Sequence, residues 1–249
     1  MHLSRDAFLC GKLHLWQPVQ GYRAATDAVL LAAACPAQAG QSVLDLGCGV
    51  GAASLCLGVR VQGLRLAGCE VQPEYADLAR RNAAENGFEM QIETGDVIAM
   101  PRALRRDFDH VIANPPYYPK GGTPSPIAGR ATALQLQDAP LGVWVQAAAR
   151  RLAPRGWLTL ICGADGLPDV LSAMGEKLGS ASVLPLAARA GRPALRVIVR
   201  ARKTGRGAFR LLAPFVIHAG DAHEGDRESY TQAANAVLRG GGDLCWAFD

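Results

Sequence analysis

The chain has 249 residues, of which 49% are hydrophobic and 19% are charged, and its formal net charge is +4. These values exclude general disorder, and no stretch approaches the roughly 20 apolar residues of a transmembrane helix. The small positive charge permits a polyanionic partner without requiring one. Seven cysteines, without a Cys-x-x-Cys pair, indicate reduced thiols rather than a disulfide framework or a zinc site. The N-terminus lacks a basic flank followed by an apolar run, so we expect one soluble, cytoplasmic domain over residues 1–249.

The predicted elements begin with a helix over Thr26–Ala34, capped by Thr26 or Asp27. Strands and helices then alternate, with strands at Ser42–Leu46, Arg65–Glu70, Met90–Thr94, Phe108–Ala113 and Gly156–Cys162 and helices at Ala52–Val61, Pro73–Asn86 and Leu141–Leu152. The last third favours strands separated by turns, at Ser182–Ala187, Leu195–Ala201 and Phe209–His218, before a closing helix from Tyr230 to Leu238. Strands spaced by helices predict a parallel α/β sheet with right-handed crossovers, and the last strands predict an antiparallel edge.

A glycine loop directly after the first of these strands is the first informative site. Its glycines are Gly47, Gly49 and Gly51, and Asp45 stands two residues before them. Glycine permits positive φ and lets a ligand approach the main chain. A dinucleotide site would show Gly-x-Gly-x-x-Gly, with a pyrophosphate at the helix N-terminus. The shorter spacing and the carboxylate of Asp45 favour a cationic ligand without phosphate, such as S-adenosylmethionine; a tight turn without a ligand is the alternative.

The next strand ends in a carboxylate, Glu70, which is followed by Val71. In doubly wound folds, an acidic residue about 20 positions beyond the glycine loop accepts the ribose hydroxyls of a nucleoside. Dehydrogenases and methyltransferases share this feature, so Glu70 does not separate the two classes. A solvated acid at the end of a strand is the alternative interpretation.

The segment Asn114-Pro115-Pro116-Tyr117 ends the fourth strand and is the candidate catalytic site. The exocyclic amine of adenine is a poor nucleophile, because its lone pair is delocalised into the ring. Two acceptors aimed at its hydrogens, the Asn114 side-chain oxygen and the Pro115 carbonyl, would favour the tetrahedral nitrogen without a strong base. Tyr117 is placed to stack on a planar base, and Tyr118 either helps or packs. A proline-rich turn is the alternative.

Together, these motifs resemble the class I S-adenosylmethionine-dependent methyltransferases that act on adenine, guanine or glutamine nitrogen. The stretches Gly21–Ala32 and Tyr230–Gly240 extend the resemblance to the bacterial tRNA adenine-N6 methyltransferase family (methyltransferase small domain), which modifies an adenine beside the anticodon of valine tRNA. The resemblance implies a Rossmann-like fold with a seven-stranded, mostly parallel sheet, an antiparallel edge and helices on both faces. It implies S-adenosylmethionine as cofactor, RNA, in particular tRNA, as partner, and no metal. The oligomeric state stays open.

The resemblance also assigns roles to individual residues. Residues 1–40 form a segment that covers cofactor or substrate, and residues 41–249 form the catalytic core. The resemblance implies that Asp96 accepts a hydrogen bond from the cofactor adenine amine; a structural turn aspartate is the alternative, and Glu93 takes the role if the register slips. The residues expected at the cofactor are Tyr22, Arg23, Thr26, Asp45, Gly47, Cys48, Gly49, Gly51, Glu70, Val71, Asp96, Val97 and Asn114. For Tyr22 and Arg23, packing in front of a capped helix is an equal alternative.

Basic residues form two groups, one at Arg102, Arg105 and Arg106 and a denser one from Arg189 to Arg210. They form either a phosphate-binding surface or a solvated charged edge. The preferred candidates for substrate contact are Tyr118, Lys120, Arg130, Arg189 and Arg192. The Gly/Pro-rich loop Lys120–Pro126 and the acidic stretch Asp221–Glu228 depart from the family pattern and weaken the assignment to valine tRNA in particular.

Three other functions compete with adenine methylation. A glutamine-N5 protein methyltransferase would use the same catalytic segment, but such enzymes carry a separate helical N-terminal domain, which the short segment here does not match. A guanine-N2 RNA methyltransferase would be favoured by Phe in place of Tyr117. A non-catalytic nucleoside- or RNA-binding module would show a damaged glycine loop or a lost Asn114, and the sequence shows neither.

Overall fold

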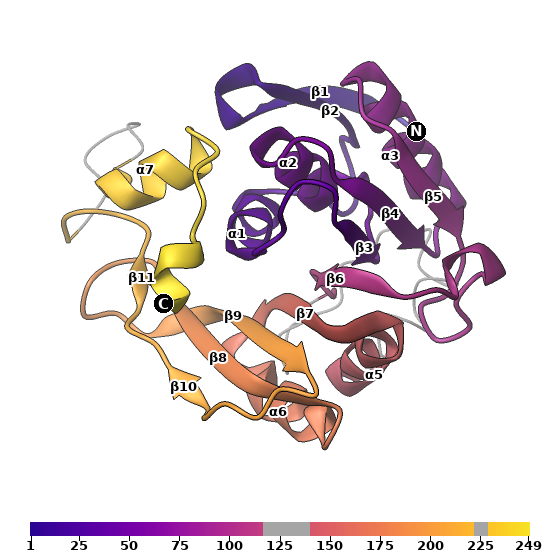
Figure 1. Cartoon of the computed structure of the whole chain (residues 1–249). Helices are drawn as coiled ribbons and strands as arrows, with labels where there is room; N and C mark the ends of the chain where they lie inside the picture. The colour runs from indigo at the N-terminus through magenta and orange to yellow at the C-terminus, as the bar shows by residue number, and fades with distance from the viewer. Residues whose placement is uncertain (117–139, 222–228) are drawn as a thin grey trace.

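The computed structural model describes residues 1–116, 140–221 and 229–249 (Figure 1). Its strands are β1 (Leu3–Phe8), β2 (Leu13–Pro18), β3 (Ser42–Leu46), β4 (Arg65–Glu70), β5 (Met90–Thr94), β6 (Phe108–Ala113), β7 (Leu152–Gly163), β8 (Leu178–Ala187), β9 (Ala194–Lys203), β10 (Arg210–Leu211) and β11 (Phe215–Val216). Its α-helices are α1 (Thr26–Ala34), α2 (Ala52–Arg60), α3 (Pro73–Glu85), α5 (Leu141–Arg151), α6 (Leu167–Met174) and α7 (Gln232–Leu238). Short 3-10 turns are η1 (Leu9–Gly11), η2 (Arg102–Leu104), η3 (Ala164–Gly166) and η4 (Cys245–Phe248).

The central sheet has the strand order β10-β8-β9-β7-β6-β3-β4-β5, with β11 also paired to β8. All its pairings are parallel except those of β9, which runs antiparallel to both β7 and β8. The strands β3 to β9 are the seven expected ones, and β10 and β11 add two residues each at the edge. The structure therefore confirms the predicted class I methyltransferase fold. The antiparallel part of the sheet consists of one strand, β9, which lies between β7 and β8.

The two faces of the sheet bury separate cores. Along β3 and β6, Val43 and Ile112 belong to the core under α1, α2 and α3, whereas Leu44 and Val111 belong to the core under α5 and α6. Successive side chains of a strand point to opposite faces, so a buried apolar run of this kind needs helices on both sides. Figure 1 shows α1, α2 and α3 on one side of the sheet and α5 and α6 on the other.

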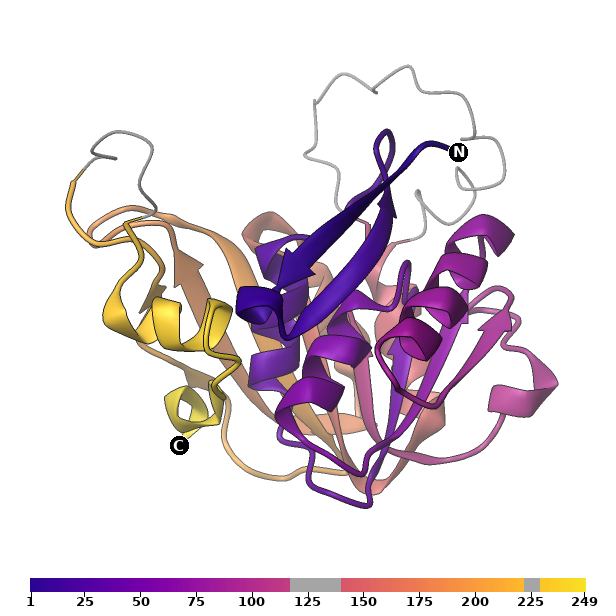
Figure 2. The same cartoon turned by 90° about the horizontal axis from the view of Figure 1, so that it is seen from above.

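An N-terminal hairpin of β1 and β2, which the sequence analysis did not predict, packs on α2 and α3 (Figure 2). Asn82 in α3 and Asn86, the residue directly after that helix, hold the second strand of the hairpin. Asn82 Oδ1 accepts from the Trp16 N–H at 2.8 Å, and Asn86 Oδ1 accepts from the His14 N–H at 3.0 Å. Asn82 Nδ2 also donates to the carbonyl of Val50 at 3.0 Å, so the hairpin is tied to the glycine loop.

Some predicted elements differ in detail. The residue before α1 is Ala25, and neither Thr26 nor Asp27 makes a side-chain cap there, so the predicted cap is wrong. Phe209–His218 is not one strand, because Pro214 interrupts it and only two short pairings remain. Helix α6 was not predicted. Within the described residues, no helix has both the length and the apolar character needed to cross a membrane.

Candidate functional site

The carboxyl ends of β3, β4 and β6 bring the three sequence motifs to one edge of the sheet. Leu46 pairs with Cys69 on one side and with Ala113 on the other. The residues that follow these three in the sequence are therefore neighbours. They are the glycine loop after Leu46, Glu70 after Cys69, and Asn114 after Ala113. Strand order thus assembles a site from segments that lie far apart in the sequence, at the edge where open α/β sheets bind ligands.

All three glycines of the loop have positive φ, at 66° for Gly47, 54° for Gly49 and 84° for Gly51. A side chain at Gly47 is excluded for a second reason, because an added Cβ would lie 2.7 Å from the Trp144 ring of α5. Only glycine combines this backbone conformation with such close packing. The loop is held in place by Gly47 N–H, which donates to the Cys69 carbonyl at 2.8 Å.

Glu70 braces the loop with its carboxylate. One oxygen accepts from the Gly49 N–H at 2.8 Å, and the other accepts from the Gln72 N–H at 2.9 Å. Burial raises the pKa of Glu70, and these backbone hydrogen bonds partly offset that rise. A carboxylate has about four lone-pair positions, so each oxygen can accept one further hydrogen bond from a ligand.

Asp45 is a buried acid directly behind the loop, with 2% of its surface exposed. Its Oδ2 accepts from the Ser54 hydroxyl at 2.9 Å in the first turn of α2. Burial raises the pKa of Asp45 to about 7, against the lowering effect of the Ser54 hydrogen bonds, and Glu70 raises it further. The site therefore contains two closely spaced carboxyls whose ionised forms would be stabilised by a cation.

Tyr22 lies over the glycine loop and reaches the catalytic segment. Its ring carbon Cε1 is 3.7 Å from the position of a Cβ on Gly49, and its hydroxyl accepts from Asn114 Nδ2 at 3.2 Å. Although 51% of Tyr22 is exposed, its hydroxyl end faces inward. Desolvation, followed by the charges of Asp27, Asp45 and Glu70, raises its pKa to about 12, so the phenol is neutral.

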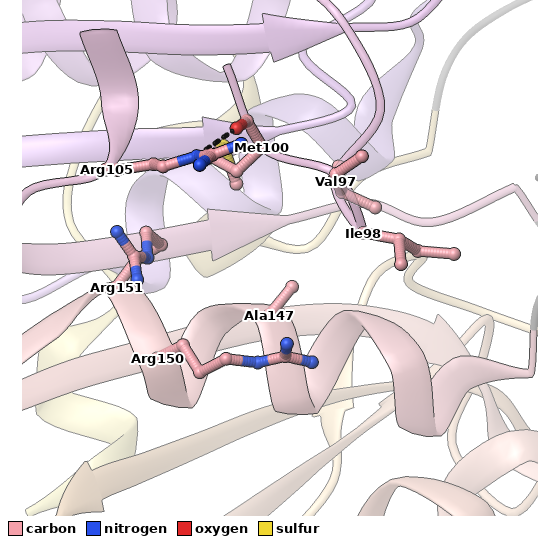
Figure 3. Close-up of a pocket in the computed structure, with 8 residues that line it drawn as sticks. Val97, Ile98, Met100, Arg105, Ala147, Arg150 and Arg151 are labelled. Carbon is pink, nitrogen blue, oxygen red and sulfur yellow. Dashed lines mark hydrogen bonds between the residues drawn. The ribbon is translucent and has the colours of Figure 1, made fainter. Parts of the chain in front are cut away.

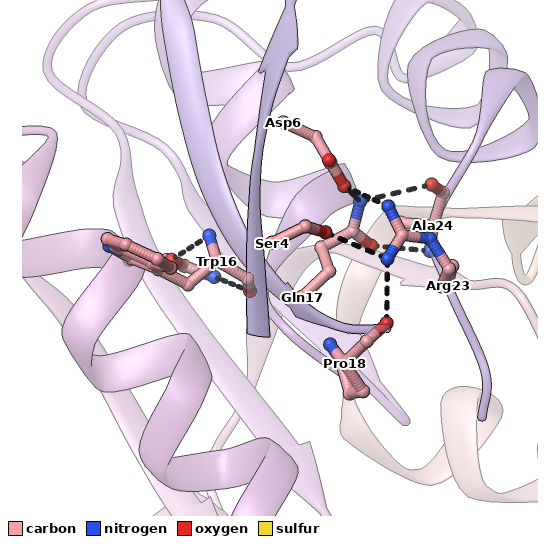
Figure 4. Close-up of polar contacts among 8 residues, drawn as sticks. Ser4, Asp6, Trp16, Gln17, Pro18, Arg23 and Ala24 are labelled. Carbon is pink, nitrogen blue, oxygen red and sulfur yellow. Dashed lines mark hydrogen bonds and ion pairs between the residues drawn. The ribbon is translucent and has the colours of Figure 1, made fainter. Parts of the chain in front are cut away.

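Arg23, the next residue, is held by the N-terminal hairpin (Figure 4). Its guanidinium pairs with the Asp6 carboxylate and donates to the Ser4 hydroxyl and the Pro18 carbonyl at 2.9 and 2.7 Å. The hairpin therefore fixes the chain entering Ala24 and α1. Thr26 is exposed at the start of that helix.

The acid predicted to bind the cofactor adenine, Asp96, follows β5 at the same edge. Its Oδ1 accepts from the Ile98 N–H at 2.7 Å, which forms a local turn. Beside it lies a cleft of about 170 Å³ (Figure 3), lined by Val97, Ile98, Ala99, Met100, Arg105, Ala147, Arg150 and Arg151. Val97, which follows Asp96 directly, therefore lines the same cleft as Arg150 and Arg151 of α5.

The basic residues of the C-terminal third separate by strand direction. Arg189 and Arg192 lie in the turn from β8 to β9, at the same edge as Asn114. Arg189 donates to the carbonyls of Ala219 and Gly220 at 2.6 and 2.8 Å, and Arg192 is exposed. Arg196, also near this edge, pairs with Asp27 of α1 at 3.0 Å.

Three other arginines of the two basic groups do not share that surface. Arg200 is only 8% exposed and stacks over the rings of Trp157 and Phe248, so it contributes to packing. Arg202 lies toward the opposite end of β9 and donates to the Arg155 carbonyl at 3.0 Å. Arg106, in the first basic group, also lies near the opposite edge, over the ring of Phe108. The catalytic edge therefore receives only part of the predicted basic surface.

Several expected site residues, Tyr117, Tyr118, Lys120 and Arg130, lie outside the described residues. The sequence analysis missed Tyr75, Asn82 and Trp144, which support the loop and the covering segment. Tyr75 and Trp144 lie in the first turns of α3 and α5, Asn82 lies further along α3, and no sequence motif marks any of the three. Among the described residues, no cluster of His, Cys, Asp and Glu could hold a metal ion.

Comparisons with known proteins agree with this geometry. The family "Methyltransferase small domain" matches residues 24–184. A tRNA1(Val) (adenine(37)-N6)-methyltransferase of Porphyromonas gingivalis is 33% identical over 177 residues, which cover 68% of this chain and 69% of that protein. A solved structure from Agrobacterium tumefaciens, described as a predicted O-methyltransferase, has a TM-score of 0.69 and 25% identity and covers 88% of this chain and 98% of that one.

A solved 16S rRNA N2 methyltransferase of T. thermophilus, in complex with AdoMet and guanosine, shares the fold with a TM-score of 0.53. It is 20% identical, and the match covers 81% of this chain and 50% of that one. The glycine loop, the acid after β4 and the predicted catalytic segment after β6 all lie within residues 24–184, which match the family. The chain belongs to the methyltransferase small domain family and is an S-adenosylmethionine-dependent methyltransferase.

Proposed function

We propose that this enzyme methylates the N6 amine of an adenine in tRNA. The observation that carries the proposal is the position of Asn114 and Pro115 at the end of β6, beside the glycine loop after β3. The relative from P. gingivalis supports the choice of acceptor, since its name specifies adenine N6 in a valine tRNA. We also place the protein in the cytoplasm, where such a substrate is found, and treat residues 1–249 as one domain with residues 1–40 as a covering segment.

The residues of the site fit S-adenosylmethionine. Three glycines with positive φ expose main chain for close contact, and Glu70 has lone pairs left for the ribose hydroxyls. Burial raises the pKa of Tyr22, and the nearby carboxyls of Asp27, Asp45 and Glu70 raise it further; carboxyls at this edge suit a sulfonium and an ammonium group. Asp96, Val71 and Val97 would surround the adenine, and Tyr22 and Thr26 would cover the methionine end.

S-adenosylmethionine, when bound, supplies an electrophilic methyl group on sulfur. The protein's part is to hold the acceptor nitrogen in line with it. The Asn114 side-chain oxygen and the Pro115 carbonyl would each accept one amine hydrogen, so the nitrogen becomes tetrahedral and its developing positive charge meets two dipoles. Pro115 has no N–H and a fixed φ, so its carbonyl is held by a rigid segment. No base is needed before transfer, because the cationic product amine loses its proton to solvent water afterwards.

Contacts with RNA are proposed at the edge of the sheet where the amine must enter. Arg192 is exposed there, and Arg189 shapes the same turn through its bonds to Ala219 and Gly220. Tyr117 would stack on the extruded base; Tyr118, Lys120 and Arg130, which lie outside the described residues as Tyr117 does, are further candidates for substrate contact. Stacking and phosphate contacts are how proteins commonly hold an unpaired base in RNA.

Labelled cofactor offered with RNA, DNA and protein extract in separate reactions tests the proposal. We expect the label in RNA, and N6-methyladenosine after digestion to nucleosides. Label in protein glutamine or on guanine N2 would replace adenine with the corresponding acceptor. Label on a hydroxyl oxygen would agree with the description of the A. tumefaciens structure and would overturn nitrogen methylation.

A further inference from the structure

The hydroxyl of Tyr22 contacts the side-chain amide of Asn114, the proposed catalytic asparagine. Asn114 Nδ2 lies 3.2 Å from it and donates to it. Tyr22 is itself fixed at its backbone, because its N–H donates to the Tyr75 hydroxyl at 3.1 Å and its carbonyl accepts from the same hydroxyl at 3.2 Å. Tyr75 is 7% exposed on α3, and Gly21 packs against its oxygen. The backbone from which the Tyr22 side chain extends is thus held in place by Tyr75.

The orientation of the Asn114 amide decides whether the site works. A carboxamide has an acceptor on one side and a donor on the other, and the two are almost the same size and shape. Only the oxygen can accept a hydrogen from the acceptor amine. If the amide turned over, its NH₂ would face another NH₂ group, and the site would lose one of its two acceptors. A flexible side chain at the end of a strand needs an external contact to select one of these orientations.

The protonation state of Tyr22 allows the productive orientation. Burial, followed by the charges of Asp27, Asp45 and Glu70, raises the pKa of Tyr22 to about 12, so the phenol is neutral. The oxygen of a neutral phenol keeps lone pairs that can accept a hydrogen bond. The lone pairs then receive a donor, which on Asn114 can only be Nδ2.

We propose that Tyr22 is a positioning residue that binds the Asn114 amide nitrogen and so directs the Asn114 oxygen at the acceptor amine. The inference rests on the proposed function, since it needs an amine acceptor. It gives Tyr22 a role in the methyl-transfer step, in addition to covering the glycine loop. The ring supplies the cover, 3.7 Å from the Gly49 position, and the hydroxyl supplies the orientation.

Tyr22→Phe separates these two roles, because it keeps the ring and removes the hydroxyl. We expect the maximal rate of RNA methylation to fall about 3- to 10-fold, the range expected for removal of one neutral hydrogen bond, while the Kd for S-adenosylmethionine is unchanged. Tyr230→Phe is the matched control, because Tyr230 stacks on His218 away from Asn114 and should keep its rate. Single-turnover rates at saturating cofactor give the comparison.

A second pair of variants, made in a protein that carries Asn114→Asp, tests whether Tyr22 acts through the orientation of the side chain at position 114. Asn114→Asp carries oxygen on both sides, so neither orientation of the group is wrong. There, adding Tyr22→Phe should cause no further loss of rate. Equal losses in the two backgrounds, a full rate for Tyr22→Phe alone, or a loss caused by weaker cofactor binding would each overturn the inference. RNA methylation by the wild-type enzyme is measured before the variants. If the wild-type enzyme labels no RNA, the proposed function is wrong, and this result is distinct from a failure of the inference on Tyr22.

Discussion

Glu70, at the end of β4, accepts a hydrogen bond of 2.8 Å from the main-chain N–H of Gly49, in the loop that follows β3. The same carboxylate accepts from Gln72, so one buried and one half-buried donor depend on it. Replacing it with an amide leaves one of these N–H groups facing an NH₂ group. The loss of one such partner costs about 1–3 kcal/mol.

Glu70→Gln should therefore lower the melting temperature and weaken the binding of S-adenosylmethionine, because both the loop and the ribose contact are affected. Thermal melts with and without cofactor measure both effects. Glu89→Gln, at an exposed position, is the control and should leave both values unchanged. A Glu70→Gln protein with normal stability and cofactor affinity would contradict the bracing role.

Cofactor affinity should depend on pH through Asp45. Its pKa is raised to about 7, so part of the free protein carries a protonated Asp45 near neutrality. A bound cation favours the ionised form and lowers this pKa, so binding releases a proton. Affinity should then rise as the pH increases toward 7 and level off above it, about tenfold for each unit by which the pKa falls.

Calorimetric titrations across this pH range would measure the effect. S-adenosylhomocysteine has a neutral sulfur and should show a smaller rise, and Asp45→Asn should remove the part due to this group. An affinity that stays level, or falls, as the pH increases toward 7 would show that the cation does not act on Asp45.

Gly47 and Gly191 offer a matched pair of substitutions. Both have positive φ, at 66° and 70°, but an alanine methyl at Gly47 would meet Trp144 at 2.7 Å, whereas at Gly191 it would meet nothing within 4 Å. Gly191→Ala thus shows the backbone strain, about 1 kcal/mol, and Gly47→Ala adds an overpacking term of about 1–3 kcal/mol. Urea unfolding gives both free energies. Equal losses would mean that Trp144 does not restrict the loop.

RNA binding should depend on salt through Arg192. Removing one interaction with a phosphate reduces the slope of log affinity against log salt by about 0.7 to 0.9. Arg192→Gln should show one such reduction, while cofactor binding stays normal. Arg206→Gln is the control, because Arg206 is exposed and follows the end of β9 that lies opposite the proposed RNA surface. Equal salt slopes for Arg192→Gln and the wild type would exclude a phosphate contact at this turn.

Much of the sheet could be predicted from sequence because its strands carry short, continuous apolar runs between clear breaks. The strand Ser42–Leu46 and the helix starting at Pro73 match the structure at these positions, where glycine and proline mark the boundaries. The motifs also lie together as expected, because consecutive parallel strands end at one edge. These features depend on local pattern and on chain order.

The N-terminal hairpin was missed although its strands, with six residues each, are as long as strands that were predicted. The alternation of Leu13 and Leu15 with His14 and Trp16 was a usable strand signal. Its attachment through Asn82 depends on tertiary contacts that no local pattern encodes. The same limit applies to Tyr22, whose contact with Asn114 joins residues 92 positions apart.

The rate of methyl transfer by Asn114→Ala tests the central claim most directly. The claim is that the Asn114 oxygen, with the Pro115 carbonyl, holds the acceptor amine for the methyl group. We predict a single-turnover rate about 10²- to 10³-fold below that of the wild type, the cost of removing one preorganised polar group, with S-adenosylmethionine still bound normally. A variant that binds cofactor and methylates RNA at the wild-type rate would contradict the mechanism.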